Sequence, residues 1–263
     1  MTAKELFEAG KLSAAIEQLN QDIKANPRDS RSRIFLFELL CFSGDLQRAE
    51  RQLDTIAQLS GDVNVEIGTQ TYKNLLEAEK SRARFFSAGG QPKFLSKAPP
   101  YTHMHLEALT ELRENRPAQV DKLLEESASS RAKVSGAVDG KPFSEFRDCD
   151  DLLAPFLEVA LQREYAWLPI ENIKSIEIAA PKKLRDLIWI SAKIETRDAP
   201  LGEVFLPALY HGSSEQPDDN LKLGRMTDWK TIGEGICSGI GQRMFLIDQT
   251  EHPMLEIRKI EFS

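Results

Sequence analysis

The 263-residue sequence has few cysteines and no long hydrophobic run. Its three cysteines, Cys41, Cys149 and Cys237, are odd in number and far apart, which argues against a disulfide framework and a Cys-x-x-Cys metal site. No stretch approaches the roughly 18 apolar residues of a membrane-spanning helix, and residues 1–5 lack the apolar core of a signal peptide. We therefore expect a cytoplasmic protein without membrane insertion.

An excess of positive charge is also lacking. The chain has 34 basic and 41 acidic residues, a formal net charge of -7, and no concentrated basic stripe. Because phosphate neutralisation dominates affinity for nucleic acids, this balance argues against a nucleic-acid partner. With 41% hydrophobic and 29% charged residues, the composition is that of a globular chain long enough for two domains.

Motifs for catalysis or cofactor binding are lacking too. The glycine-rich segment 233–241 has neither the dinucleotide-binding spacing nor the Lys-Ser/Thr pair of a phosphate loop, so we interpret it as a flexible surface loop. Cys237 lies beside Ser238, but no base is near in sequence and no nucleophile elbow exists. The sequence predicts a protein without catalytic residues or cofactor.

Two clusters of metal-ligand residue types fit structural roles better. Asp148, Asp150 and Asp151 could hold a divalent cation, but the glycine and later glutamate of a calcium loop are missing. A turn followed by a helix N-cap is the better interpretation. His103 and His105, two residues apart, do not share a helix face and have no third ligand nearby. We therefore predict no required metal.

What the sequence does contain is a repeat of period 34 in its first third. Large, Gly, Ala and large residues recur in that order, which is typical of tetratricopeptide repeats. Two unrelated helical hairpins are the alternative. In either case residues 3–60 are predicted to form two antiparallel helix pairs, with glycine in each turn. The matched pairs are Leu6 and Leu40, Gly10 and Gly44, Ala15 and Ala49, and Leu19 and Leu53; Pro27 and Gly61 close the two units.

After this repeat the pattern changes from helices to strands. One long helix is expected at 65–86, and a degenerate third repeat at 101–115 and 117–133. An Asp-Gly hairpin turn follows at 138–141. We expect an α+β protein with a helical domain at 1–133 and an α+β domain at 134–263. Expected strands lie within 156–161, 173–178, 187–194, 204–209, 243–247 and 254–262, with short helices as the alternative at 152–161 and 182–188.

Long, ordered motifs in the second half resemble a known family. Four segments carry the resemblance: Tyr-Ala-Trp-Leu-Pro at residues 165–169, a segment at 181–189 that ends in Trp189, and segments at 202–210 and 223–229. Two shorter segments, 147–151 and 241–243, also fit the family's pattern. Together with the repeats they resemble the ImpE/TagJ family of type VI secretion accessory proteins over nearly the whole chain. At Ile190-Ser191 a proline would be expected after the tryptophan.

The resemblance implies an accessory protein of the contractile sheath. It implies binding to the small sheath subunit, at a helix near that subunit's N-terminus, and a link to the sheath-disassembly ATPase. It assigns no catalytic residues. An adaptor of this kind would use a concave helical-repeat surface or the α+β half. The alternative is an enzyme or ligand-binding protein with a polar pocket in the second domain.

Six residues of the motifs are candidate partner- or ligand-binding residues. Trp167, Trp189 and Trp229 are expected mainly as core anchors whose indole groups bond to backbone, and otherwise as the lining of a groove for a partner helix. Arg225 is expected to hold the carboxylate of Asp186 or Asp228 bidentately. The three polar side chains would alternatively form a ligand pocket.

Overall fold

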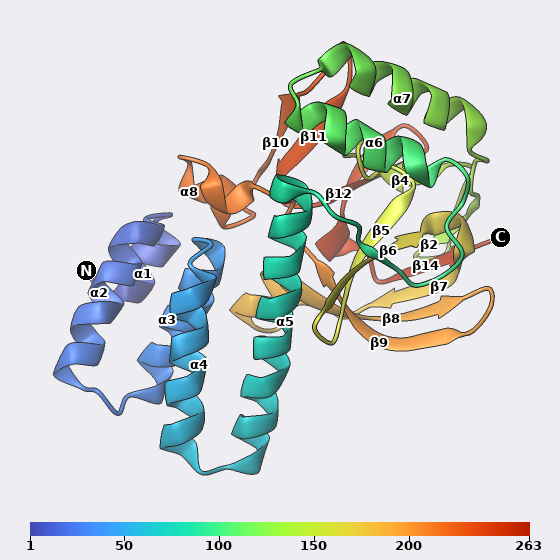
Figure 1. The fold of residues 1–263 in the computed structure, drawn as a ribbon. Helices are drawn as coiled ribbons and strands as arrows, with labels where there is room; N and C mark the ends of the chain where they lie inside the picture. Colours follow the sequence, from blue (N-terminus) through green and yellow to red (C-terminus); the bar gives the residue numbers. More distant parts are fainter.

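The protein is described over residues 1–263 by a computed structural model, in which a helical first half precedes a sheet-rich second half (Figure 1). The fold is α+β, as expected. The helices of the first half are α1 (Ala3–Glu8), α2 (Leu12–Ala25), α3 (Ser30–Phe42), α4 (Leu46–Ser60), α5 (Val63–Ala88), α6 (Thr102–Arg113) and α7 (Pro117–Ser130).

The first four helices form the two predicted pairs. The turns between α1 and α2 and between α3 and α4 contain Gly10 and Gly44, with φ of 72° and 76°, a left-handed conformation that costs glycine little. Asp45 caps α4 by accepting from the Arg48 amide. Ala15 and Ala49 are fully buried, so the helices of each pair approach closely at these positions. The prediction of helix at residues 3–60, without strand, is confirmed.

Helix α5 links the helix pairs to the rest of the molecule. Gly61, with φ of 62°, ends α4, and the Asp62 carboxylate caps α5. In Figure 1, α5 stands between α4 and strands β5 (Phe156–Leu161) and β6 (Glu164–Pro169), and it contacts all three. Helices α6 and α7 pack on each other beyond its C-terminal end.

A nine-stranded sheet dominates the second half. Its order is β1-β6-β5-β9-β8-β7-β14-β2-β3, and only β1 pairs in parallel, with β6. The strands not yet bounded are β1 (Lys93–Phe94), β2 (Gly136–Val138), β3 (Lys141–Phe143), β7 (Ile173–Ile178), β8 (Trp189–Thr196), β9 (Pro200–Pro207) and β14 (Lys259–Phe262). The strand at 156–161 is confirmed over its helical alternative.

Smaller elements complete the fold. Helix α8 (Asp219–Lys222) is a single turn, and four 3-10 turns are η1 (Ile170–Asn172), η2 (Leu184–Leu187), η3 (Ser213–Glu215) and η4 (Met254–Glu256). The two further sheets are β13-β12-β4 and β10-β11. Their strands are β4 (Phe146–Asp148), β10 (Thr227–Thr231), β11 (Cys237–Gly241), β12 (Met244–Ile247) and β13 (Thr250–Pro253).

The glycine-rich segment is a correction to the sequence analysis. We expected a flexible loop at 233–241, but residues 237–241 form β11 and pair with all of β10. The glycines make room there. A Cβ on Gly239 would lie 2.3 Å from the Tyr210 ring, and one on Gly241 would lie 2.1 Å from the Met226 carbonyl oxygen. The glycines therefore permit close packing rather than flexibility.

The hydrophobic core has three clusters, and two of them combine both halves. One cluster lies within the sheet half. Another joins α1–α5 to Trp189 and Leu209, and the third joins α5–α7 to Phe156 and Trp167. The composition change expected at 127–141 coincides with the end of α7 and the start of β2. The division into domains 1–133 and 134–263 stays a prediction.

None of the helices has the length and apolar character needed to cross a membrane.

Candidate functional site

A buried ionic network joins the long helix to the sheets. Arg82 on α5 donates from Nε and Nη2 to the two carboxylate oxygens of Glu158 on β5, at 2.7 and 2.8 Å. Arg243 donates to the same carboxylate and to Asp148 on β4. All four residues are at most 3% exposed. Two cations and two anions thus alternate across the junction between the halves.

The charges of the network shift the pKa values of its own members. Burial alone would raise the pKa of Glu158, but Arg82 and Arg243 outweigh it and lower this pKa to about 2. For Asp148, burial outweighs the single neighbouring arginine and raises the pKa. The carboxylates raise the pKa of both guanidinium groups against the effect of burial. Glu158 is therefore the charge on which both arginines depend.

Two of the three tryptophans anchor this network. The Trp167 indole donates to the Tyr165 hydroxyl at 2.6 Å, and that hydroxyl donates to Glu158. The Trp189 indole donates at 3.2 Å to Glu79, which also accepts from Arg82 at 3.0 Å. Trp167 and Trp189 are buried, as expected of core anchors. The expected backbone partners are wrong, because both indoles bond to side chains.

Trp229 differs from the other two. It lies on β10, half-buried, with its ring 5.9 Å from that of Tyr210. Its indole makes no hydrogen bond. A role for any of the three tryptophans in binding a partner stays a prediction.

The polar candidates do not form the expected ion pair. Arg225 donates to the Phe7 and Glu8 carbonyl oxygens and stacks on the Phe7 ring. It therefore connects the loop after α8 to α1. Asp186 accepts from the amides of residues 182 and 183 at the start of η2, and exposed Asp228 accepts from the Trp229 amide. Backbone groups satisfy all three side chains, so the structure corrects this expectation.

The aspartate cluster shapes a turn. Asp150 accepts from Leu152 N, Ser238 Oγ and Gly239 N, at 2.8–2.9 Å. Burial, reinforced by the Asp148 charge, raises the pKa of Asp150 to about 7. No group of three metal-ligating residues is present. The expected helix N-cap is wrong, because the chain turns directly into β5.

One serine–histidine pair has a geometry that the sequence did not indicate. His105 Nε2 lies 2.7 Å from Ser127 Oγ, and Nδ1 lies 2.9 Å from the Leu152 carbonyl oxygen. Burial lowers the His105 pKa to about 4, so the ring is neutral. Both residues are buried, so no substrate can reach the hydroxyl. Exposed His103 contacts the Pro100 carbonyl oxygen instead. The pair connects α6, α7 and the Leu152 turn.

Cysteine nucleophiles are also disfavoured. Burial raises the pKa of Cys41, and it raises the pKa of Cys149 to about 12, so both thiols stay protonated at neutral pH. Cys237 N, rather than its thiol, is the group that Asp151 holds, at 2.8 Å.

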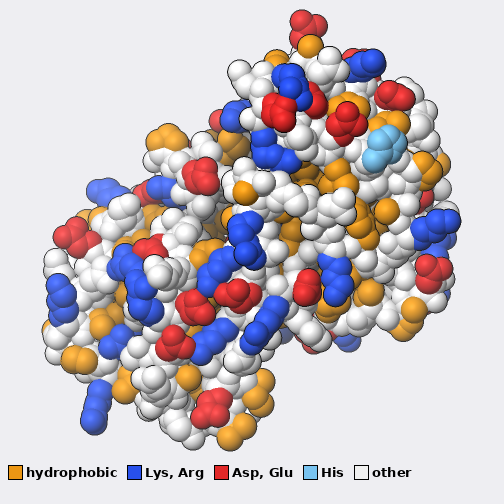
Figure 2. All heavy atoms as spheres, in the orientation of Figure 1, with side chains coloured by type: hydrophobic (Ala, Val, Ile, Leu, Met, Phe, Trp, Pro, Cys, Tyr) orange, Lys and Arg blue, Asp and Glu red, His pale blue; other side chains and the backbone are white.

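An exposed hydrophobic patch lies at the tip of the α4–α5 pair. It consists of Leu59 at the end of α4 and Val63 and Ile67 in the first turns of α5, which are 40%, 65% and 62% exposed. Val63 and Ile67 are four residues apart and share a helix face. In Figure 2 orange side chains gather at the lower end of the molecule, where Figure 1 places this turn. We call this set the tip patch.

Comparisons with known proteins give one family match in the second half and two relatives that cover nearly the whole chain. A sequence model of the family described as "ImpE protein" matches residues 140–261. The chain is 32% identical over 263 residues to the "Type VI secretion system accessory component TagJ" of Pseudomonas aeruginosa, covering 100% of this chain and 92% of that protein. It also resembles the crystal structure of protein VPA1032 from Vibrio parahaemolyticus, with a TM-score of 0.90 and 26% identity over 99% of this chain and 97% of that one.

Proposed function

The chain belongs to the ImpE family, which includes the type VI secretion accessory component TagJ, and from that premise we propose that it is a cytoplasmic, non-catalytic adaptor for a contractile-sheath subunit. The proposed partner is a helical segment of the small sheath protein. By binding it, the adaptor would modulate sheath assembly or disassembly, with a link to the disassembly ATPase.

The tip patch is the observation that carries this proposal. Leu59, Val63 and Ile67 leave apolar area in water at the end of a helix pair in which other large apolar side chains, such as Leu53 and Ile56, are buried. A docked amphipathic helix presents anchors at i, i+3 or i+4, and i+7, which match such a ridge. Each apolar side chain removed from water contributes up to about 1.5–3 kcal/mol. The net charge of -7 favours a basic or amphipathic segment.

Two further features support an adaptor over an enzyme. The buried ionic network and the Ser127–His105 pair have every polar atom engaged by protein and are inaccessible to a substrate. The polar candidates Asp186, Arg225 and Asp228 hold backbone rather than facing one another. The family relative is likewise named an accessory component.

The test uses the full-length chain, because two core clusters contain residues from both halves and a fragment would expose them. The purified small sheath subunit, with and without its N-terminal helix, is mixed with this protein and separated by size-exclusion chromatography. The account expects a complex with the intact subunit and none with the truncated one. Equal co-elution of both forms, or of neither, contradicts it.

A further inference from the structure

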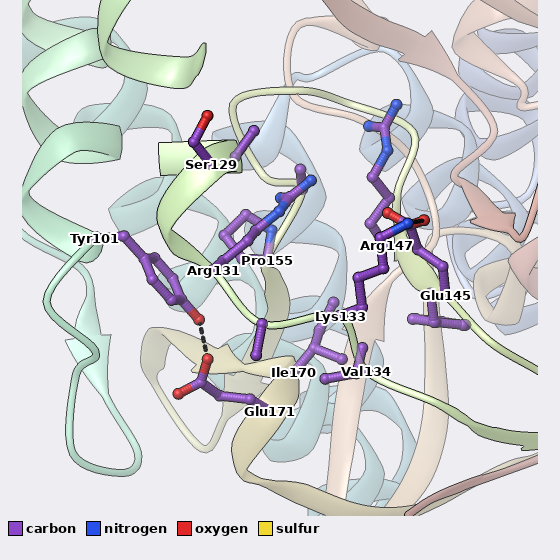
Figure 3. Close-up of a pocket in the computed structure, with 14 residues that line it drawn as sticks. Tyr101, Ser129, Arg131, Lys133, Val134, Glu145, Arg147, Pro155, Ile170 and Glu171 are labelled. Carbon is purple, nitrogen blue, oxygen red and sulfur yellow. Dashed lines mark hydrogen bonds and ion pairs between the residues drawn. The ribbon is translucent and has the colours of Figure 1, made fainter. Parts of the chain in front are cut away.

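A cavity of 340 Å³ lies where the end of α7 meets β4 and η1 (Figure 3). Half of its lining residues are apolar, with Val134 and Ile170 among them, and the rest are polar or charged. This volume suits a small molecule. None of the candidate residues from the sequence motifs lies in it. We call it the α7 cavity.

Some charged side chains of the α7 cavity have protein partners and others do not. Lys133 pairs with Glu145 at 2.7 Å, and Tyr101 donates to Glu171 at 2.7 Å. Arg131 makes no ion pair and no side-chain hydrogen bond, although it is half-buried. In Figure 3 its side chain lies between those of Tyr101 and the second arginine of the lining.

That second arginine is Arg147, and it faces the same space. Arg147 uses Nη1 to reach Asp151 at 3.0 Å and the Asp148 carbonyl oxygen at 3.0 Å, so its Nε and Nη2 have no protein acceptor. Burial, and next the charge of Arg147, lower the pKa of Arg131. Two guanidinium groups with free donors thus repel each other beside a partly apolar cavity.

An unpaired cation that is partly removed from water and lies near a like charge lowers the free energy of unfolding. A bound carboxylate or phosphate would remove the repulsion and accept from the free donors of both forks, the geometry in which arginine binds such groups best. At the opposite end, the Glu171 carboxylate has one oxygen without a protein donor. The cavity therefore combines an anion-accepting end, an apolar wall and an acceptor for a ligand hydroxyl or ammonium group.

We propose that the α7 cavity is a ligand site that binds a small organic anion, with its carboxylate or phosphate group held between Arg131 and Arg147. The site goes beyond the proposed adaptor function and does not depend on it, because its residues are remote in sequence from the tip patch and its ligand is not a protein.

The test measures thermal unfolding and calorimetric binding of the full-length chain with succinate and, separately, inorganic phosphate. Sodium chloride matches the ionic strength, since salt alone screens exposed charges. The variant is Arg131→Met, which keeps much of the stem and removes the charge. Arg28→Met, an exposed arginine of the helical half without side-chain partners, is the matched control.

The proposal expects at least one of the two anions to raise the melting temperature as its concentration increases. Arg131→Met should weaken binding at least about tenfold, because a hydrogen bond to a charged group is worth that or more. Arg28→Met should bind as the wild type does. In chloride alone, Arg131→Met should melt at the same or a higher temperature, since an unpaired cation has been removed. The stronger of the two anions identifies the ligand group.

Any of three results would overturn the proposal. The first is that neither anion raises the melting temperature more than chloride does. The second is that Arg131→Met binds with wild-type affinity, and the third is that Arg131→Met melts lower than the wild type in chloride, which would make the guanidinium a structural group.

Discussion

Arg82 on the long helix α5 holds both carboxylate oxygens of Glu158 on strand β5, at 2.7 and 2.8 Å, across 76 residues of sequence. This buried bidentate pair links the helical half to the sheet. Because Arg243 shares the same carboxylate, Glu158 is the residue whose loss leaves most charge uncompensated.

We predict that Glu158→Gln destabilises the protein by about 3–5 kcal/mol, because two buried arginines lose their shared counter-charge. Urea unfolding at neutral pH measures this free energy. Glu164→Gln, an exposed glutamate on β6 without side-chain partners, is the control and should change stability by less than about 0.5 kcal/mol. Equal effects of the two substitutions would show that the network contributes nothing specific.

Comparison of the wild type with Glu158→Gln also gives a prediction on the pH dependence of stability. The folded-state pKa of Glu158 is lowered to about 2 from its ordinary value of 4.5, so its contribution to stability is present above pH 4.5 and is lost as the pH falls toward 2. A shift of this size corresponds to about 3 kcal/mol. The stability difference between wild type and Glu158→Gln should therefore shrink between pH 4.5 and pH 2. A constant difference over that range would contradict the lowered pKa.

A third prediction concerns the helix pairs. Ala15 and Ala49 are fully buried at matched positions of the repeat, so Ala15→Leu or Ala49→Leu should destabilise by roughly 1–3 kcal/mol through overpacking. Ala25→Leu, at the exposed end of α2, is the control. Thermal melts that do not distinguish the buried sites from Ala25 would argue against close helix approach.

The sequence predicted the elements that local patterns specify. The 34-residue period gave both helix pairs and their turns, because Gly10 and Gly44 need a left-handed backbone. The Asp-Gly pair gave the β2–β3 hairpin, where Asp139 and Gly140 have φ of 49° and 80°. Short apolar or alternating runs gave the strands at 156–161 and 173–178 with the observed bounds.

The sequence could not predict the contacts that depend on chain topology. Arg82, Asp148, Glu158 and Arg243 are up to 161 residues apart, and each alone resembles a surface charge. Parts of the network did carry a signal, since segments 147–151 and 241–243 were among the family-like motifs. Arg225 was assigned to a carboxylate because pairing is the usual fate of arginine, whereas it binds carbonyl oxygens at the C-terminal end of α1.

A fourth prediction tests the tip patch as the docking surface. The double substitution Val63→Asp and Ile67→Asp should leave the melting temperature nearly unchanged, because both side chains are exposed and acidic residues suit the start of a helix. It should weaken binding of the sheath segment at least about tenfold by removing apolar contacts. Met226→Asp, at an exposed hydrophobic residue of the sheet half, is the control and should bind normally. Loss of binding in the control alone would place the surface on the sheet half.

The most direct test of the adaptor account is calorimetric titration of the N-terminal helical peptide of the cognate small sheath subunit into the full-length protein. The account predicts saturable binding near one peptide per chain that persists at moderate salt, because apolar anchors are not screened as exposed charges are beyond about 8 Å. No heat of binding at high protein concentration, or binding that disappears at moderate salt, would contradict it.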